Sequence, residues 1–184
     1  MLQAINPSTG QLIAEYPTLS KTQVDERIES AQEAFLSWRS LTLNQRAEIL
    51  GKVAEVLREN KAVIGQLMTE EMGKPVKEAG PEVEKSAWCL DHYASRAEEY
   101  LADQVLTSDA GTSYVKHQPL GVLLGVLPWN APLWIAFRYL APALMAGNTC
   151  VMKHDPHVPA CAEAIAKAFV QAGAPADIVV NLPL

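Results

Sequence analysis

The sequence from residue 121 to residue 156 reads GVLLGVLPWNAPLWIAFRYLAPALMAGNTCVMKHDP, and it decides the fold of the chain. An aliphatic run, Val122–Leu127, ends at a proline and is followed by an apolar segment, Pro132–Ala146, that closes on a Gly-Asn pair. Helices tolerate proline at their first position and favour glycine just beyond their last, so this segment predicts a helix. A second apolar run ends at Lys153 and predicts a strand. The first run is too uniformly apolar for a half-exposed strand, which favours a parallel strand covered on both faces.

The end of the chain continues the same alternation. A helix is predicted over residues 159–172 and a third strand over residues 177–182. Because crossovers between parallel strands are right-handed, this β-α-β-α-β order predicts half of a doubly wound domain. The fold class is therefore α/β, with N-terminal helices that lead into an incomplete doubly wound parallel sheet. Asn130 and Lys153 each follow the carboxyl end of neighbouring strands, where open α/β sheets bind ligands.

The region before this sheet predicts mainly helices. Two segments of capping-box form, Ser20–Gln23 and Thr42–Gln45, predict the starts of the first two helices. A third helix is predicted over Lys61–Met72, and Gly80-Pro81 makes us start the fourth near Pro81. The aromatic residues of these helices are interpreted as core packing; they include Trp38, Trp88 and Tyr93.

Turns and strands are predicted around these helices. Residues 6–10 predict a turn, and residues 11–17 predict a short edge strand. Residues 102–111 are polar and predict a loop, whereas residues 112–118 alternate and predict a strand.

The composition indicates a folded globular chain of 184 residues, because 49% of the residues are hydrophobic and 20% are charged. A net charge of −6 argues against a nucleic-acid partner, which requires a basic surface. The apolar segment Pro132–Ala146 is shorter than the ~20 residues of a membrane span, so we expect no membrane partner. The first ten residues lack the features of a secretory signal. We therefore expect a cytoplasmic protein.

The three cysteines do not form a pattern that suggests chemistry. Cys89, Cys150 and Cys161 are widely spaced and include no CxxC pair, so neither a zinc site nor a disulfide framework is predicted. We interpret them as structural thiols and predict no metal site.

Several motifs together resemble the aldehyde dehydrogenase family. They are Pro128-Trp129-Asn130 with Pro132, the segment 141–149 (APALMAGNT), Lys153, the opening turn Asn6–Gly10 and the segment Met72–Pro75. The resemblance covers essentially the whole chain. It implies an N-terminal portion that stops before the segments with the nucleophilic cysteine and the catalytic glutamate, so we expect the chain alone to be inactive.

The resemblance also implies how the chain is organised. Residues 1–111 would be the mainly helical part of the cofactor domain, and residues 121–184 a partial dinucleotide-binding unit. Residues 112–120 would link to a sheet through which the family forms homo-oligomers. No G-x-G-x-x-G motif follows the first strand, and the family places its phosphate contact later in the chain.

Asn130 is the candidate catalytic residue that the resemblance implies. An amide N–H aimed at the oxyanion, which forms when a thiolate adds to an aldehyde, would stabilise that charge. The alternative is an asparagine that satisfies backbone groups in the turn after a strand. Leu127, Pro128 and Trp129 would contact the cofactor together with Asn130.

Lys153 is the candidate contact to the cofactor ribose. A lysine at the end of the second strand could donate to the ribose hydroxyls or pair with a 2′-phosphate. The alternative is a solvated lysine at a strand end. Many family members follow this lysine with Pro-Ser-Glu, whereas this chain has His154, Asp155 and Pro156. This departure leaves NAD and NADP both open as cofactors, and we interpret both His154 and His157 as loop residues.

Arg138 is the one charged residue in the apolar helix. A buried arginine needs a partner. The structural alternatives are an ion pair or a side chain whose charged end reaches solvent, and the functional alternative is a bidentate contact to a substrate carboxylate. In succinate-semialdehyde dehydrogenases an arginine at this spacing contacts the substrate carboxylate, and a Lys-His pair like Lys153-His154 occurs in one branch of them. The best substrate prediction is therefore succinate semialdehyde.

Two further hypotheses stay open. The chain could be a non-enzymatic interaction module whose last strand leaves an unpaired edge for a second copy or a full-length relative. It could also be an unrelated α/β ligand-binding domain, which fold-level reasoning alone supports.

Overall fold

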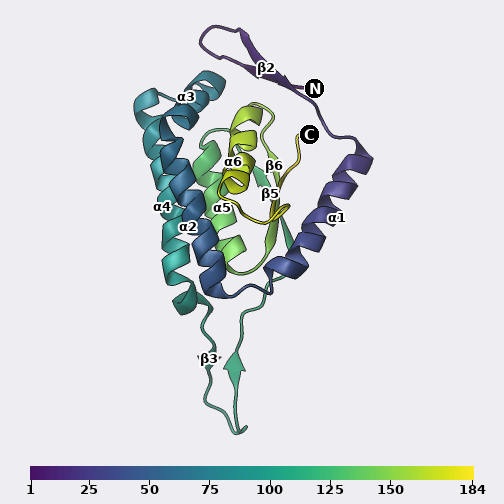
Figure 1. Ribbon diagram of the computed structural model, residues 1–184, viewed down its shortest axis with the longest axis vertical. Coiled ribbons are helices and arrows are strands. Elements are labelled where there is room, and N and C mark those ends of the chain that lie inside the picture. Colours follow the sequence, from purple (N-terminus) through teal and green to yellow (C-terminus); the bar gives the residue numbers. More distant parts are fainter.

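The computed structural model describes all 184 residues. The elements in chain order are β1 (Leu2–Ile5), β2 (Leu12–Tyr16), α1 (Lys21–Trp38), α2 (Leu43–Glu59), α3 (Lys61–Met72), α4 (Val76–Leu101), β3 (Gln104–Val105), β4 (Tyr114–Val115), β5 (Val122–Leu127), α5 (Pro132–Met145), β6 (Thr149–His154), α6 (Pro159–Gln171) and β7 (Val179–Asn181). Figure 1 shows them as layers: α2 and α4 lie outside α5 and α6, which cover one face of the sheet, and α1 lies on the other side. No helix is long and apolar enough to cross a membrane.

The central sheet confirms the predicted β-α-β-α-β unit. Its strand order is β5-β6-β7, and both pairs are parallel. Strand β5 covers the predicted residues Val122–Leu127, and α3 covers the predicted Lys61–Met72. Both predicted capping boxes are present, at Ser20 before α1 and at Thr42 before α2. The local sequence signals therefore place most elements correctly.

One hydrophobic core joins the helical part to the sheet. It contains 30 buried residues, from Trp38 at the end of α1 to Ile178 before β7. The indole Nε1 of Trp38 donates a hydrogen bond to the backbone oxygen of Leu144, 3.0 Å away, at the end of α5. Trp38 is thus a core residue as predicted, but the same prediction is wrong for Trp88, whose side chain is 65% exposed.

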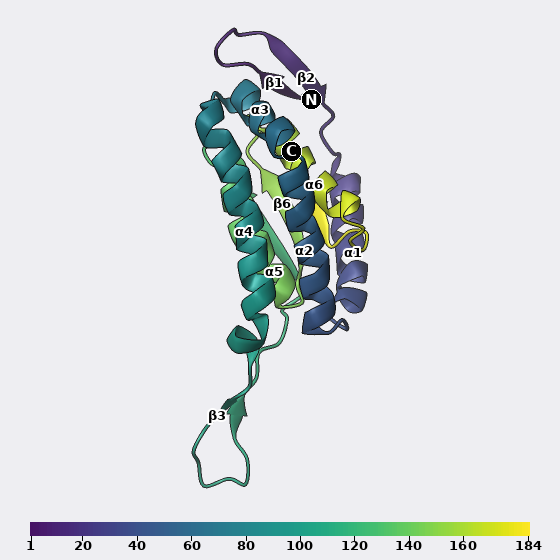
Figure 2. The ribbon, with the colours of Figure 1, turned by 60° about the vertical axis from the view of Figure 1, so that its left-hand side comes forward.

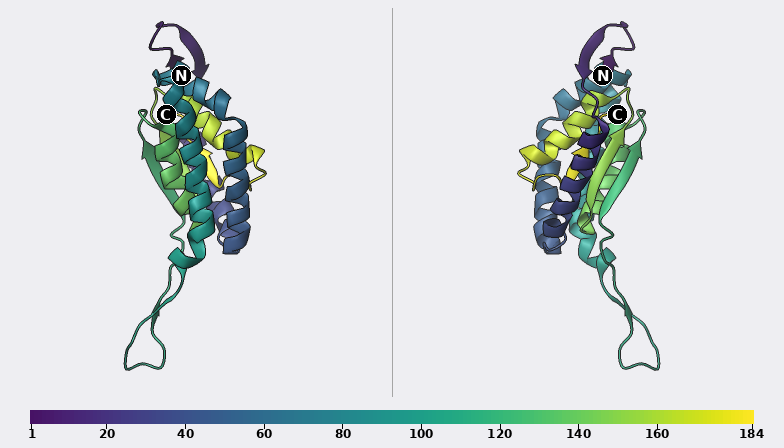
Figure 3. Two further views of the ribbon diagram at one scale, coloured as in Figure 1. Left: turned by 90° about the vertical axis from the view of Figure 1, so that its left-hand side faces the viewer. Right: turned by 90° about the vertical axis from the view of Figure 1, so that its right-hand side faces the viewer.

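The prediction that β5 is covered on both faces is wrong. Leu124 and Val126 are 65% and 72% exposed and lie on the face that α1 covers only in part. Helix α1 packs mainly on β6, where Val151 is buried against Ala31, and the two views of Figure 3 show β5 at the margin of the layers. Strands β5 and β7 each pair only with β6, so the sheet has two unpaired edges and not only the one predicted at the last strand.

The predicted start of α4 near Pro81 is also wrong, because this helix begins at Val76 and contains Pro81. Only one turn precedes the proline, so few backbone hydrogen bonds are lost. The close contact there depends on Gly65 of α3, since a Cβ built on it would lie 3.3 Å from the backbone nitrogen of Gly80. Gly65 therefore permits close approach of α3 to α4 at Gly80, which lies inside α4 and does not end it.

The strand predicted over residues 112–118 is much shorter in the structure. Only Tyr114 and Val115 form β4, which pairs with the two residues of β3 inside the predicted loop 102–111. Figures 1 and 2 show that this arm projects away from the body of the molecule. No core packs against the arm, so the alternating sequence forms only a two-residue strand.

We predict that a methyl group at residue 125 destabilises the fold. Gly125 of β5 faces Tyr139 of α5, and a Cβ built there would lie 2.6 Å from the tyrosine ring. Gly125→Ala should therefore lower the free energy of unfolding by about 1–3 kcal/mol in urea titrations. Gly51→Ala is the matched control, because Gly51 lies inside α2 with no atom within 4 Å of a built Cβ. That variant should be more stable by about 0.5–1 kcal/mol, and an equal effect of both substitutions would contradict the prediction.

Candidate active site

The carboxyl edge of the sheet brings the two predicted groups of site residues together. In the parallel register Leu127 is opposite His154, the last pair of β5 and β6. The loop with Pro128, Trp129 and Asn130 and the loop that begins at Asp155 therefore leave the sheet side by side. Pro128, Trp129, Asn130 and Pro156 are exposed, whereas Lys153 and Asp155 are half-buried and Leu127 is buried. The hairpin of β1 and β2 lies above this edge, and a cavity of about 420 Å³ between them includes Trp129 and His157.

The side chain of Asn130 is free to act on a ligand. It lies between the end of β5 and the start of α5, and its amide makes no hydrogen bond within the chain. The only asparagine that ties this region to backbone groups is Asn148, whose Oδ1 accepts from the N–H groups of Leu120 and Gly121. The alternative interpretation of Asn130, a residue that satisfies its own turn, finds no supporting contact.

Lys153 lies on the opposite face of the sheet from α5. It is opposite Val126 in the register and shares the α1 face with Val151. No carboxylate lies within 4 Å of its ammonium group, and it donates no hydrogen bond. A half-buried and unpaired ammonium at this edge fits a ligand with hydroxyl or phosphate oxygens.

The prediction that His154 is a loop residue is wrong. It is the last residue of β6 and is 5% exposed. Its Nδ1 accepts from the backbone N–H of Asp155 at 2.9 Å, so its Nε2 carries the proton and donates to the backbone oxygen of Pro132 at 3.0 Å. Burial lowers the pKa of the imidazole, which keeps it neutral. His154 thus connects the end of β6 to the start of α5, and both ring nitrogens are occupied.

Asp155 shapes the second loop. Its Oδ1 accepts the backbone N–H of His157 at 2.9 Å and contacts the His157 Nδ1 at 2.8 Å. Burial would raise the pKa of this carboxyl, but the hydrogen bonds from His157 hold it below the usual value. No group of three or more His, Cys, Asp or Glu side chains could hold a metal ion.

Two buried glutamates that sequence analysis missed cap the helices behind these loops. Glu82 of α4 accepts the N–H groups of Leu133 and Trp134 at 3.1 Å each, and it forms a buried ion pair with Lys74. Helix α5 begins with a proline, and the residue before it, Ala131, has no side-chain acceptor. Glu82 therefore supplies the cap that the local sequence lacks.

Glu71 of α3 does the same for α6. Its two oxygens accept the N–H groups of Ala160 and Cys161 at 2.7 and 2.9 Å. Burial raises its pKa, although these hydrogen bonds act in the opposite direction. Helix N-termini after the strands are the usual phosphate sites of dinucleotide-binding folds. Here carboxylates fill both of them. The signal in the sequence was the apolar residue, Ala131 or Val158, before each helix-starting proline.

Arg138 lies on α5 and is exposed, which agrees with the alternative in which its charged end reaches solvent. Its guanidinium makes no ion pair. It reaches a groove between α4 and α5 that encloses about 360 Å³ and is lined by Trp88, Cys89, His92, Tyr93, Trp134 and Arg138. Trp88 and Tyr93 were expected to pack in the core, because the local sequence does not show that they line a groove beside a helix about fifty residues later.

None of the three cysteines has the properties of a nucleophile. All are buried and free. Burial raises the pKa of Cys150 to about 12 and raises those of Cys89 and Cys161 as well. Reactive cysteines have depressed pKa values and partial exposure, so these residues are structural thiols, as expected.

We predict that Glu82→Gln lowers the free energy of unfolding by about 3 kcal/mol, because it leaves Lys74 buried without a counter-ion. Urea titration would measure the loss. The control is Glu78→Gln, an exposed residue of the same helix, which should change stability by less than about 0.5 kcal/mol. The double variant Lys74→Met with Glu82→Gln should lose less than the two single variants together. Strict additivity would show that the ion pair does not couple the two residues.

Comparison with known proteins identifies the family. The profile of the aldehyde dehydrogenase family matches residues 1–183. A probable NADP(+) succinate-semialdehyde dehydrogenase from Synechocystis is 47% identical over 174 residues, which is 95% of this chain and 38% of that protein. The NAD(P)+ succinate semialdehyde dehydrogenase Sad of Escherichia coli K12 is 34% identical over 95% of this chain and 38% of its own length. The chain thus spans little more than a third of these relatives.

Solved structures agree with this result. The succinic semialdehyde dehydrogenase of Streptococcus pyogenes, in complex with NADP+, matches all of this chain and 41% of its own with a TM-score of 0.96 and 32% identity. The structure of Gox0499, described in terms of cofactor and substrate selection, matches all of this chain and 40% of its own with a TM-score of 0.97 and 34% identity. From its sequence, its fold and the carboxyl-edge loops described above, the chain belongs to the aldehyde dehydrogenase family.

Proposed function

We propose that this chain supplies part of the active site of an NAD(P)-dependent aldehyde dehydrogenase that oxidises succinate semialdehyde to succinate. The observation that carries the proposal is the amide of Asn130, which is exposed and unbonded at the carboxyl edge of the sheet. Relatives that share 34% to 47% of the residues are named for this reaction.

Asn130 would act on the oxygen of the aldehyde. When a thiolate adds to the carbonyl carbon, the π electrons move to the oxygen and leave it negatively charged. An amide N–H already directed at that oxygen stabilises the charge at no cost of reorganisation, and loss of one such donor typically raises the barrier by about 2.7–4 kcal/mol. The adjacent helix start is held by Glu82 and His154, which keeps the loop of Asn130 in place.

The cofactor would lie across the edge formed by Leu127, Pro128, Trp129 and Asn130 on one loop and Lys153 to Pro156 on the other. A nicotinamide dinucleotide supplies the acceptor for the hydride that leaves the aldehyde carbon. The residues present fit its ribose, because Lys153 has an ammonium group without a partner. The relatives named for NADP(+) favour NADP, and Pro156 offers no carboxylate that would exclude a 2′-phosphate.

Arg138 would hold the carboxylate of the substrate. Its guanidinium is exposed to the groove beside α5 and has no carboxylate partner within the chain. Aromatic side chains line the same groove and suit a short aliphatic chain. An aldehyde with a terminal carboxylate therefore fits this site better than an uncharged aldehyde.

The 184 residues would not catalyse the reaction by themselves. All three cysteines are buried with raised pKa values, so none can serve as the thiolate. The purified chain should form no NADPH from NADP and succinate semialdehyde, and clear turnover would overturn this part of the proposal.

The role of Asn130 is testable in a chimera. Residues 1–184 would replace the matched N-terminal portion of the Synechocystis relative, which supplies the remainder of the enzyme. We expect the chimera to form NADPH and Asn130→Ala to lower its kcat about 100- to 1,000-fold. Asn44→Ala, at an exposed position of α2, is the control and should leave kcat unchanged. A fully active Asn130→Ala chimera would remove Asn130 from the mechanism.

We also propose a cytoplasmic homo-oligomer. The three free cysteines suit a reducing compartment. The β3–β4 arm exposes Val105, Leu106 and Tyr114 away from the core, which suits contact with another subunit. The alternative function, an interaction module, is supported by the exposed edge of β5 with Leu124 and Val126.

Size-exclusion chromatography of the chain tests self-association. Both the homo-oligomer and the interaction module require a dimer or larger species at micromolar concentration. Val105→Ser with Tyr114→Ser removes apolar groups from the arm and should dissociate the homo-oligomer to monomers. Val126→Lys should instead dissociate a dimer that forms through β5. A monomer in the unsubstituted chain would argue against both.

A further inference from the structure

The indole of Trp134 is close to two cations. The Lys85 Nζ is 3.9 Å from the centre of this ring, and the Arg138 Cζ is 5.6 Å from it. Both distances fall within the ~6 Å range of a cation–π contact. Trp134 belongs to the first turn of α5, which follows the loop of Asn130 directly. Arg138 lines the groove between α4 and α5, and Lys85 lines a neighbouring hollow that shares Trp88 with it.

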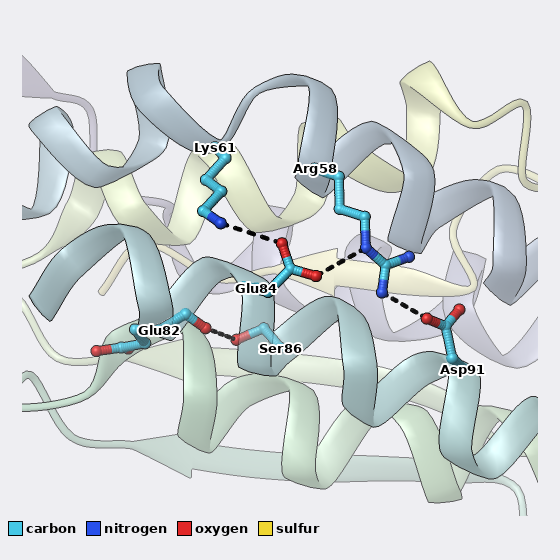
Figure 4. A network of polar contacts seen from close by, with 6 residues as sticks. All are labelled: Arg58, Lys61, Glu82, Glu84, Ser86 and Asp91. Carbon is cyan, nitrogen blue, oxygen red and sulfur yellow. Dashed lines mark hydrogen bonds and ion pairs between the residues drawn. The ribbon is translucent and has the colours of Figure 1, made fainter.

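Neither cation is neutralised within the chain. No carboxylate lies within 4 Å of Lys85 or Arg138. Three carboxylates of α4 are engaged elsewhere, and Figure 4 shows two of them, Glu84 and Asp91, which pair with Arg58 at 2.9 and 2.6 Å. Glu84 also pairs with Lys61, and Glu82 pairs with Lys74. Glu84 is next to Lys85 in sequence and lines the same hollow, but its carboxylate pairs with Arg58 and Lys61, so Lys85 keeps its positive charge without an ion-pair partner.

The surroundings of these cations suit the rest of a small ligand. Trp88, Cys89 and Tyr93 provide apolar surface along the groove, and its volume of about 360 Å³ is sufficient for a few carbon atoms and a carboxylate. Lys85 lies one turn before Trp88 and Cys89 on α4, so its side chain projects toward the same side. The combination of an aromatic slot and two unpaired cations favours an anion with an apolar body.

We propose that Lys85 is a second specificity-determining residue, which holds the carboxylate of the substrate together with Arg138 beside the ring of Trp134. This inference rests on the proposed function and extends it to a residue of α4. The chemical class is a short, unbranched aldehyde with a terminal carboxylate. Its cationic site is divided between α4 and α5, so the relative position of these helices selects the length of the substrate.

The experiment measures binding of butyrate to the purified chain by the intrinsic fluorescence of its tryptophans. Butyrate has the carbon number and the carboxylate of the proposed substrate but no aldehyde, and butyramide is its neutral counterpart. We expect butyrate to bind more tightly than butyramide. Lys85→Gln should weaken butyrate binding about 3- to 5-fold, as expected for loss of one partly solvated charge contact, and should leave butyramide binding unchanged.

Matched variants make the outcomes distinct. Lys85→Arg keeps the charge and should retain butyrate binding, and Lys77→Gln, an exposed lysine of the same helix, should have no effect. Equal binding by Lys85→Gln and the unsubstituted chain, with weaker binding by Arg138→Gln, would overturn the role of Lys85 but leave the carboxylate contact of Arg138. No preference for butyrate over butyramide would overturn the cationic site altogether. An inactive chimera would instead contradict the proposed function, whatever the butyrate result.

Discussion

The buried carboxylate of Glu82 holds the start of α5, and the geometry of the candidate site depends on it. Helix α5 begins with a proline after an alanine, so its first free N–H groups find no acceptor in the adjoining sequence. The carboxylate of Glu82, which belongs to α4, accepts hydrogen bonds from two of these N–H groups, and Lys74 neutralises its charge. At the other end of α5, the guanidinium of Arg46 donates to the backbone oxygen of Met145 at 3.0 Å. An anion at the N-terminus and a cation at the C-terminus both complement the helix dipole.

This arrangement has a consequence for ligand binding. In most doubly wound folds the helix N-termini after the first strands receive phosphate groups. In this chain Glu82 and Glu71 occupy the N-termini of α5 and α6, so neither helix offers its N–H groups to a dinucleotide. What is left for a ligand at this edge is a set of side chains, above all the amide of Asn130 and the ammonium of Lys153. The absence of a G-x-G-x-x-G motif in the sequence agrees with this use of the helix ends.

The errors of prediction share one physical origin. Leu124 and Val126 gave an apolar pattern typical of a covered strand, but coverage depends on how far α1 extends over the sheet. The apolar helix left open whether Arg138 is paired or reaches solvent, and the structure places it beside the groove between α4 and α5. Gly80-Pro81 has the local character of a helix break, yet α4 runs through both residues and packs there against Gly65 of α3. Each outcome depends on a neighbour distant in sequence, which a local pattern does not contain.

Local sequence determined the elements and the family. Alternating apolar runs, capping boxes and prolines at helix starts suffice because strands and helices follow short-range backbone and capping preferences. The motif around Asn130 and Lys153 placed both residues at the carboxyl edge of one sheet for the same reason. Only the tertiary structure decided which groups stay free there, because a hydrogen bond or an ion pair requires two partners in space. It left Asn130 and Lys85 without partners, used both nitrogens of His154, and brought Glu71 and Glu82 to helix starts about fifty to ninety residues away.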